Sequence, residues 1–313
     1  MKIVKYINPI FMFALTLINQ KSTEQQPKEQ KAKSFLQRKY NFEVIGHRGA
    51  RGLAPENTLA AFEKAIEIGV NTLEMDVVLT KNKKVLVSHE AWMSAKICVH
   101  KNKVIEPEQE QKHNIYKMKY AKTQEYDCGS LIHPDFDEQE NEKTTKPLLK
   151  DVLQMASALS RNHGTSIQYL IEIKSSPDGD FIYHPDPKEF VNVVLNELEA
   201  YADLKHVCLQ SFDWRILNEI KNKNPEVKVA LLTYDISLEN ALDKLKFIPE
   251  IYAPHFKQIN KNLVSLAKAN GMHIFAWTVN EIEDMHDVLQ LGVDGIITDY
   301  PNRAIKLKRN LKF

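Results

Sequence analysis

The feature that most constrains the fold of this chain is an alternation between short apolar runs and amphipathic helical patterns, which begins at Glu43. This alternation is typical of βα units that build a parallel sheet. The chain has 313 residues, of which 43% are hydrophobic, so one α/β barrel of about 250 residues can be built. We therefore expect a (β/α)8 TIM barrel. Nine extended segments are predicted, at residues 43–45, 71–79, 84–88, 168–174, 207–212, 227–233, 251–255, 272–279 and 294–298.

A closed barrel needs one strand fewer than these nine segments. Residues 251–255 are a short extended piece, and we take them as the candidate for a segment outside the closed sheet.

Reactive side chains gather at or near the C-terminal ends of the early apolar runs. His47 and Arg48 follow the first run, Glu74 and Asp76 lie two residues apart in the second, and His89 follows the third. Residues i and i+2 of a strand point to the same face, so both carboxylates project together and repel unless a cation or proton lies between them. Barrel enzymes form their sites at these strand ends. The pattern predicts metal-assisted phosphate chemistry.

Several short motifs follow one another along the chain: His47-Arg48-Gly49, Pro55-Glu56-Asn57-Thr58, Glu74-x-Asp76, His89, Gln210-Ser211-Phe212, Pro254-His255, Trp277-Thr278-Val279-Asn280 and Asp294-Gly295-Ile296-Ile297-Thr298-Asp299. Taken in their order and spacing, these motifs resemble the glycerophosphodiester phosphodiesterases. The resemblance covers about residue 42 to the C-terminus and implies a (β/α)8 barrel with a small insertion that shapes the substrate entrance. It also implies hydrolysis of a small-molecule glycerophosphodiester to glycerol 3-phosphate and an alcohol.

The resemblance implies one divalent metal ion, held by Glu74, Asp76 and Glu172. Three carboxylates suit Mg²⁺ or Ca²⁺, whereas zinc prefers Cys and His ligands. For Glu74 and Asp76 the alternative is a salt-bridged pair on a sheet surface, but their neighbours in the strand are apolar, as in a strand buried on both faces. Lys174 lies two residues after Glu172. The resemblance makes it a phosphate contact, and the alternative is an internal ion pair with Glu172.

The resemblance makes His47 and His89 the catalytic residues. One protonates the leaving alkoxide, and the other activates either water or a neighbouring substrate hydroxyl; both assignments of these two roles stay open. A histidine at a strand end is otherwise often structural. Arg48 is a candidate phosphate clamp, since guanidinium binds phosphate bidentately, or else a charge on the loop surface.

Four further residues have both a site role and a structural alternative. Glu56 and Asn57 are expected to support or line the site, although Asn57 is also a plausible helix cap. Phe212 and Trp277 are expected to form an apolar wall beside the substrate, or else to belong to the core. The other nine histidines match no metal-site spacing and are expected at the surface or in loops.

Residues 91–146 interrupt the βα alternation and are predicted to be an insertion on the active-site face. Three cysteines do not make a disulfide framework. Cys98 and Cys128 lie within this insertion and can pair in an oxidising compartment.

The N-terminus is predicted to be a secretory signal over residues 1–20, followed by a polar linker over residues 21–40. Lys2 and Lys5 precede a largely apolar run of nine residues at positions 10–18, which is too short to span a bilayer. The alternative is an N-terminal helix packed on the barrel. We expect a secreted or periplasmic protein without a stable membrane span. The net charge of +1 gives no sign of a nucleic-acid partner.

Two other functions compete with a small-molecule diesterase. A phospholipase-type phosphodiesterase would act on intact lipid head groups and would need an exposed apolar rim, which the polar insertion disfavours. A catalytically inactive binding barrel would be expected to lose some of the five residues that carry the chemistry, yet all of them are present: His47, His89, Glu74, Asp76 and Glu172.

Overall fold

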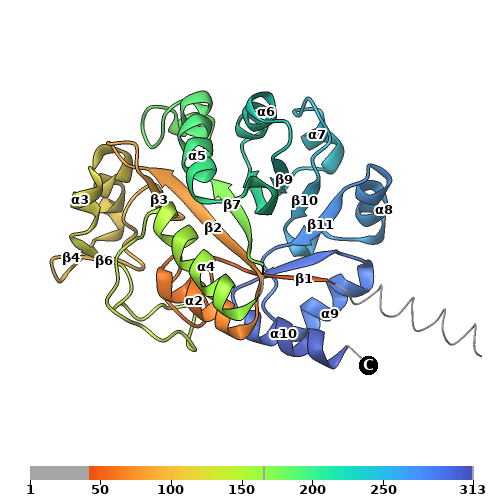
Figure 1. The fold of residues 1–313 in the computed structure, drawn as a ribbon, viewed down its shortest axis with the longest axis horizontal. Coiled ribbons are helices and arrows are strands. Elements are labelled where there is room, and N and C mark those ends of the chain that lie inside the picture. The colour runs from red at the N-terminus through yellow and green to blue at the C-terminus, as the bar shows by residue number, and fades with distance from the viewer. Residues whose placement is uncertain (1–41, 165, 312–313) are drawn as a thin grey trace, which may run out of the picture.

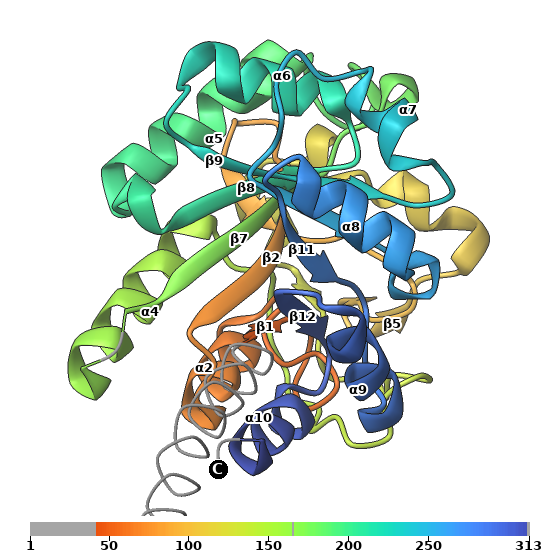
Figure 2. The same ribbon diagram turned by 90° about the vertical axis from the view of Figure 1, so that its right-hand side faces the viewer.

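The computed structural model describes residues 42–164 and 166–311, so the predicted signal and linker lie outside the described residues. Eight parallel strands close into a barrel because β1 pairs with both β2 and β12, and helices separate the strands along the chain (Figures 1 and 2). The predicted (β/α)8 barrel is confirmed. Its strands are β1 (Glu43–Gly46), β2 (Thr72–Leu79), β7 (Gln168–Ile173), β8 (Val207–Ser211), β9 (Lys228–Thr233), β10 (Ile251–Pro254), β11 (His273–Ala276) and β12 (Gly295–Thr298).

The helices that follow these strands pack their apolar faces on the barrel. They are α2 (Leu59–Ile68), α4 (Leu149–His163), α5 (Pro187–Tyr201), α6 (Trp214–Lys223), α7 (Leu238–Leu242), α8 (Lys261–Ala269), α9 (Ile282–Leu291) and α10 (Pro301–Asn310). The main core lies between this ring and the strands, and a second apolar cluster fills the inside of the barrel. The cap of α2 is Thr58, whose hydroxyl accepts from the Ala61 amide, and Gly69 ends the helix at φ 102.

The extra extended segment is β3 (Val85–Val87), which runs antiparallel to β2, and the expectation that residues 251–255 lie outside the sheet is wrong. β10 pairs with both of its neighbours in the barrel. Only five residues separate β2 from β3, and a parallel crossover needs a dozen or more. β2 therefore runs past the barrel edge and turns back as a hairpin, which brings the following residues over the barrel mouth.

Residues 91–146 form a small subdomain beside this hairpin (Figure 1). It contains α3 (Tyr120–Thr123) and a sheet in which β4 (Val99–His100) pairs with β5 (Lys103–Val104) and β6 (Tyr126–Asp127). Its own apolar cluster, which includes Met93, Ile97, Ile105 and Ile115, continues onto Val78 and Leu86 of the hairpin.

A disulfide joins Cys98 to Cys128 across this subdomain, and Cys208 is free and buried. The bond closes a loop with a sequence separation of 30. Replacing both bonded cysteines with serine is expected to lower the free energy of unfolding by about 3 kcal/mol, because the unfolded chain gains loop freedom. Urea denaturation of the variant and of the wild type, with and without a reductant, measures this. An unchanged midpoint in all samples would show that the bond contributes nothing.

Within the described residues, no helix is long and apolar enough to cross a membrane.

Candidate active site

Three buried carboxylates converge at the mouth of the barrel. Glu74 and Asp76 project from β2, and Glu172 projects from the adjacent strand β7, where it lies directly beside Asp76 in the parallel register. One oxygen of each lies within 4.8 Å of the others, and all three side chains are almost fully buried. The expectation that Glu74 and Asp76 share a strand face is met, and β7 supplies the third carboxylate.

Amide groups hold two of these carboxylates in place. The Asn57 side chain donates to Asp76 Oδ2 at 2.9 Å and accepts from the Asp76 amide, while Gln210 Nε2 donates to Glu74 Oε1 at 3.0 Å. The Oε1 of Gln210 is buried and has no hydrogen-bond partner. Asn57 therefore positions Asp76. The residue that caps α2 is Thr58 and not Asn57.

Burial and mutual repulsion decide the protonation of this cluster. Burial, followed by the Asp76 charge, raises the pKa of Glu74 well above its usual range, and burial also raises the pKa of Glu172. Burial also acts to raise the pKa of Asp76. The charges of His89, Arg48 and Lys174 outweigh burial and hold the pKa of Asp76 well below its usual range. Carboxylate oxygens are the donors that Mg²⁺ and Ca²⁺ prefer, and a cation would relieve this repulsion, so the three residues fit a hard divalent ion.

Two cations already border the cluster. Lys174 Nζ lies 2.7 Å from Glu172 Oε1 and 3.7 Å from Asp76 Oδ1, so the ion pair considered as the alternative for Lys174 is present. Arg48 is 8% exposed, and its NH1 donates to Glu56 Oε1 at 2.8 Å. Arg48 is therefore not a loop surface charge. It lines the cavity with its orientation set by Glu56.

The turn after β1 explains why the His-Arg-Gly sequence is needed there. Arg48 has a φ of 51, which lets its backbone amide donate to Glu74 Oε2 at 2.9 Å. Gly49 has a φ of 86, and a Cβ on it would lie 2.5 Å from the backbone of Ala61. A side chain at this glycine would push α2 away from the strand end and displace His47.

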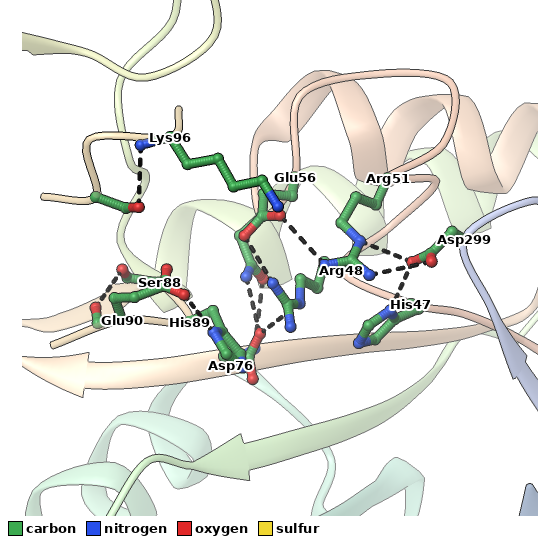
Figure 3. A network of polar contacts seen from close by, with 12 residues as sticks. His47, Arg48, Arg51, Glu56, Asp76, Ser88, His89, Glu90, Lys96 and Asp299 are labelled. Atoms are coloured by element: carbon green, nitrogen blue, oxygen red, sulfur yellow. Dashed lines mark hydrogen bonds and ion pairs between the residues drawn. The ribbon is translucent and has the colours of Figure 1, made fainter. Parts of the chain in front are cut away.

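His47 is oriented by Asp299, which follows the last barrel strand (Figure 3). Its Nδ1 lies 2.6 Å from Asp299 Oδ1, and its Nε2 lies 4.0 Å from Glu74 Oε2. Arg51 and Asn280 also donate to Asp299 at 2.7–3.0 Å. Burial lowers the pKa of His47 to about 4. The neutral ring that donates Nδ1–H to Asp299 therefore keeps a lone pair on Nε2.

Replacing Asp299 with asparagine is expected to lower kcat about a hundredfold or more, because the amide can hold His47 in the wrong tautomer. KM should change much less. Steady-state kinetics of the variant and of an exposed control, Asp287→Asn on α9, would measure this. Similar kcat values for the two variants would exclude the orienting role.

His89 reaches the cavity from the hairpin that β2 and β3 form. Its Nδ1 lies 2.7 Å from Oε1 of the adjacent Glu90, so it also has a carboxylate on Nδ1 (Figure 3). Burial lowers the pKa of Lys146, which is 2% exposed. The charges of Glu90 and Glu56 act in the opposite direction and partly offset burial. The subdomain that carries Lys146 thus contributes a buried lysine whose charge acts on Glu90, the partner of His89.

An aromatic wall closes the opposite side of the site. Phe212 and Trp277 pack edge to face with ring centroids 5.5 Å apart, and both line a cavity of about 250 Å³ together with Leu232. Trp277 Nε1 donates to the carbonyl of Ala253 at 2.8 Å, which fixes the indole. These two aromatics therefore belong to the cavity wall and not to the sealed core. His47, Arg48, His89, Glu74 and Glu172 also line this cavity.

Comparison with known proteins agrees with this geometry. The model of the Glycerophosphoryl diester phosphodiesterase family matches residues 47–303, which include every residue of the carboxylate cluster, both histidines and Asp299. The chain belongs to the glycerophosphoryl diester phosphodiesterase family.

Relatives of this phosphodiesterase match along most of their length. A glycerophosphodiester phosphodiesterase from Bacillus altitudinis is 31% identical and covers 86% of this chain and 99% of its own. The crystal structure of a glycerophosphodiester phosphodiesterase from Thermotoga maritima is 26% identical, covers 85% of this chain and 98% of its own, and superposes with a TM-score of 0.61. A phosphodiesterase from Oleispira antarctica, solved with the product sn-glycerol-3-phosphate, shares the fold at 22% identity, 86% and 96% coverage and a TM-score of 0.68.

Sequence reasoning assigned no role to five residues of the phosphodiesterase site. Asp299 ends a segment quoted for the family resemblance and follows the last strand, so its position carried a signal. Gln210 also lay in a quoted segment. The other three lie in loops or in the insertion and had no local signal: Arg51, Glu90 and Lys146.

Two of the remaining histidines are buried, although surface or loop positions were expected. His133 and His184 do lie in loops, but each is 3% exposed. The His184 ring accepts from the Ser176 amide and holds its own loop together, and His133 packs against Phe136.

Proposed function

We propose that this phosphodiesterase hydrolyses glycerophosphodiesters to glycerol 3-phosphate and an alcohol in a metal-dependent reaction that uses two histidines. The observation that carries the proposal is the arrangement of His47 and His89. Each has a carboxylate on Nδ1, and each lines the same cavity as the carboxylate cluster. A carboxylate on Nδ1 leaves Nε2 free to move a proton.

The reaction breaks the P–O bond to the alcohol and forms a P–O bond to water. One histidine accepts the proton of the attacking water, and the other gives a proton to the leaving alkoxide. Arg48 lines the cavity and offers its guanidinium to the phosphoryl oxygens, and Lys174 adds positive charge beside the cluster. Phe212 and Trp277 exclude water from one side.

Glu74, Asp76 and Glu172 would hold one divalent ion, Mg²⁺ or Ca²⁺. Bound there, the ion would supply Lewis-acid stabilisation of charge on the phosphoryl oxygens.

Release of glycerol 3-phosphate from glycerophosphocholine tests this function. The assay is run on chelator-treated protein, with no addition and with Mg²⁺ or Ca²⁺ restored. The expected result is no release in chelator and recovery with one of the two ions. Full activity in chelator would exclude metal dependence. If folded, metal-loaded protein released no glycerol 3-phosphate, glycerophosphocholine would be excluded as a substrate.

We further propose that the protein is secreted or periplasmic. The Cys98–Cys128 disulfide supports this, because such bonds persist in oxidising compartments. Fractionation of the producing cells, with antibody detection, should find the protein outside the cytoplasm. Thiol labelling after denaturation should mark only Cys208. Recovery in the cytoplasm with three labelled thiols would overturn the proposal.

A further inference from the structure

Phe136 of the insertion is 6% exposed, yet it belongs to none of the apolar clusters in the part of the chain that the structure describes. Its ring faces the guanidinium of Arg51, whose Cζ lies 4.7 Å from the ring centroid, and it also packs against the ring of His133 at 4.5 Å. A cation within about 6 Å of an aromatic ring centroid is attracted to the face of the ring. The buried phenylalanine therefore contacts a charged partner and not an apolar core.

Arg51 connects this aromatic ring to His47 (Figure 3). Its Nε and NH2 donate to the two oxygens of Asp299 at 2.8 and 3.0 Å, and Asp299 Oδ1 lies 2.6 Å from His47 Nδ1. NH1 of Arg51 lies 3.5 Å from Glu56 Oε2. The guanidinium thus has one face on the ring of Phe136 and its edges on two carboxylates, which leaves it little freedom to turn.

The segment around this phenylalanine, residues 133–142, is fixed to the loop after β1, and we call it the strap. Gln139 Nε2 donates to the backbone carbonyl of Arg51 at 2.6 Å. The backbone amide of Glu140 donates to the carbonyl of Leu53 at 3.0 Å. One side-chain and one main-chain hydrogen bond therefore hold the strap on the loop in which Arg51 lies.

The strap also contacts the chain that follows Asp299. NH2 of Arg303, on α10, donates to Glu138 Oε1 at 2.6 Å. The ring of Tyr300 packs edge to face on the ring of Phe136, with centroids 6.1 Å apart. The strap therefore bridges two segments that are far apart in the sequence, one of which supplies the histidine and the other its carboxylate partner.

We propose that the strap is a positioning element of the active site. Phe136 holds the Arg51 guanidinium against Asp299, and Asp299 in turn holds His47 with its Nδ1–H on the carboxylate. This inference rests on the proposed function and gives the insertion a part in it. Neither Phe136 nor Gln139 lines the cavity, so both act through Arg51 and do not touch the substrate.

The first test is Phe136→Leu, which keeps an apolar side chain but removes the face of the ring. The kcat for glycerophosphocholine should fall about 5- to 30-fold, as expected for the loss of a desolvated cation–π contact, and KM should stay within about twofold. Phe136→Tyr keeps the ring and should retain most of the wild-type kcat. Ile132→Ser is the matched control, because Ile132 is exposed and directly precedes the strap, and it should behave as the wild type.

A double-mutant cycle determines whether Phe136 acts through Arg51. Arg51→Met removes the cation and should lower kcat about 100-fold, since a 1 Å misplacement of a catalytic group can cost this much. In that background Phe136→Leu should have almost no further effect, because the ring has lost the group that it holds. An equal loss of kcat in both backgrounds would overturn the proposal, and so would a change in KM with kcat unaltered.

The state of His47 can be followed without turnover. In protein that carries ¹⁵N-labelled histidine, NMR identifies the tautomer with its proton on Nδ1, and the His47 signals are assigned by their loss in His47→Gln. The wild type and Ile132→Ser should show this tautomer alone, whereas Phe136→Leu and Arg51→Met should show a mixture of tautomers. The same single tautomer in every variant would overturn the proposal.

The outcomes separate this inference from the proposed function. No turnover of any diester by folded, metal-loaded wild type would refute the function, and the NMR series would still decide the role of the strap. Turnover by the wild type with an unchanged kcat in Phe136→Leu would overturn the strap proposal and leave the diesterase function standing.

A second variant keeps the test decisive if Phe136→Leu lacks the cooperative thermal transition of the wild type. Gln139→Leu removes only the hydrogen bond to the Arg51 carbonyl. It should lower kcat about two- to tenfold, the usual net contribution of one hydrogen bond, with KM unchanged. A wild-type kcat in Gln139→Leu would then overturn the proposal.

Discussion

Replacing His89 with alanine is expected to lower kcat by about 10²–10⁴-fold, the usual contribution of a positioned general acid or base. The ring lines the cavity, and Glu90 lies 2.7 Å from its Nδ1, so the free nitrogen can exchange a proton with the substrate. His89 is not one of the three residues that form the carboxylate cluster. Metal affinity should therefore stay within a few-fold of wild type while turnover collapses.

The measurement pairs single-turnover kinetics with isothermal titration of Mg²⁺ or Ca²⁺ into apoprotein. His286→Ala is a suitable control, because this half-buried histidine on α9 contacts Gln290 and does not line the cavity. A His89→Ala variant that turns over like the control would remove His89 from the mechanism. A variant that has lost metal binding as well would reassign the residue to the metal site.

Replacing Asp76 with asparagine is expected to weaken metal binding by more than about 100-fold, since even outer-shell changes cost 10–100-fold. The substitution keeps the shape but removes one negative charge between Arg48, at 3.4 Å, and Lys174, at 3.7 Å. The kcat/KM should fall by at least about 10³-fold, because a Lewis acid contributes several kcal/mol to transition-state stabilisation.

Thermal unfolding gives a readout of this loss that does not depend on activity. A ligand at one hundred times its Kd stabilises the folded protein by about 2.7 kcal/mol. The wild type should gain a higher Tm with the metal, and Asp76→Asn should gain none at the same concentration. The exposed Asp287→Asn should respond as the wild type. An equal metal-induced Tm shift in all three proteins would exclude Asp76 as a ligand.

Much of the site could be predicted from local pattern. Glu74 and Asp76 share a strand face because side chains alternate along β2, and that geometry depends only on spacing. Family resemblance added Glu172, which the structure places beside Asp76 on the neighbouring strand. The structure shows Asn57 supporting Asp76 and places Phe212 and Trp277 in the cavity wall.

One topological error had a cause that could be read from the chain. The apolar pattern of residues 84–88 predicts another barrel strand, although the five residues before β3 are too few for a parallel crossover. The length of the connection between two strands therefore distinguishes a hairpin from a βα unit where the apolar pattern alone cannot. The same hairpin delivers His89, so the misplaced strand also hid how this residue reaches the site.

The sequence by itself determined the barrel class, the paired carboxylates and both histidines, because strand periodicity and motif spacing are local properties of the chain. Only the tertiary structure decided which groups orient those histidines and how the aromatic wall of the cavity is assembled. Asp299 contacts His47 across 252 positions, and the aromatic wall joins Phe212 to Trp277, which follow two different strands. Closure of the barrel brings the ends of distant strands together, and no periodicity within a single segment encodes that contact.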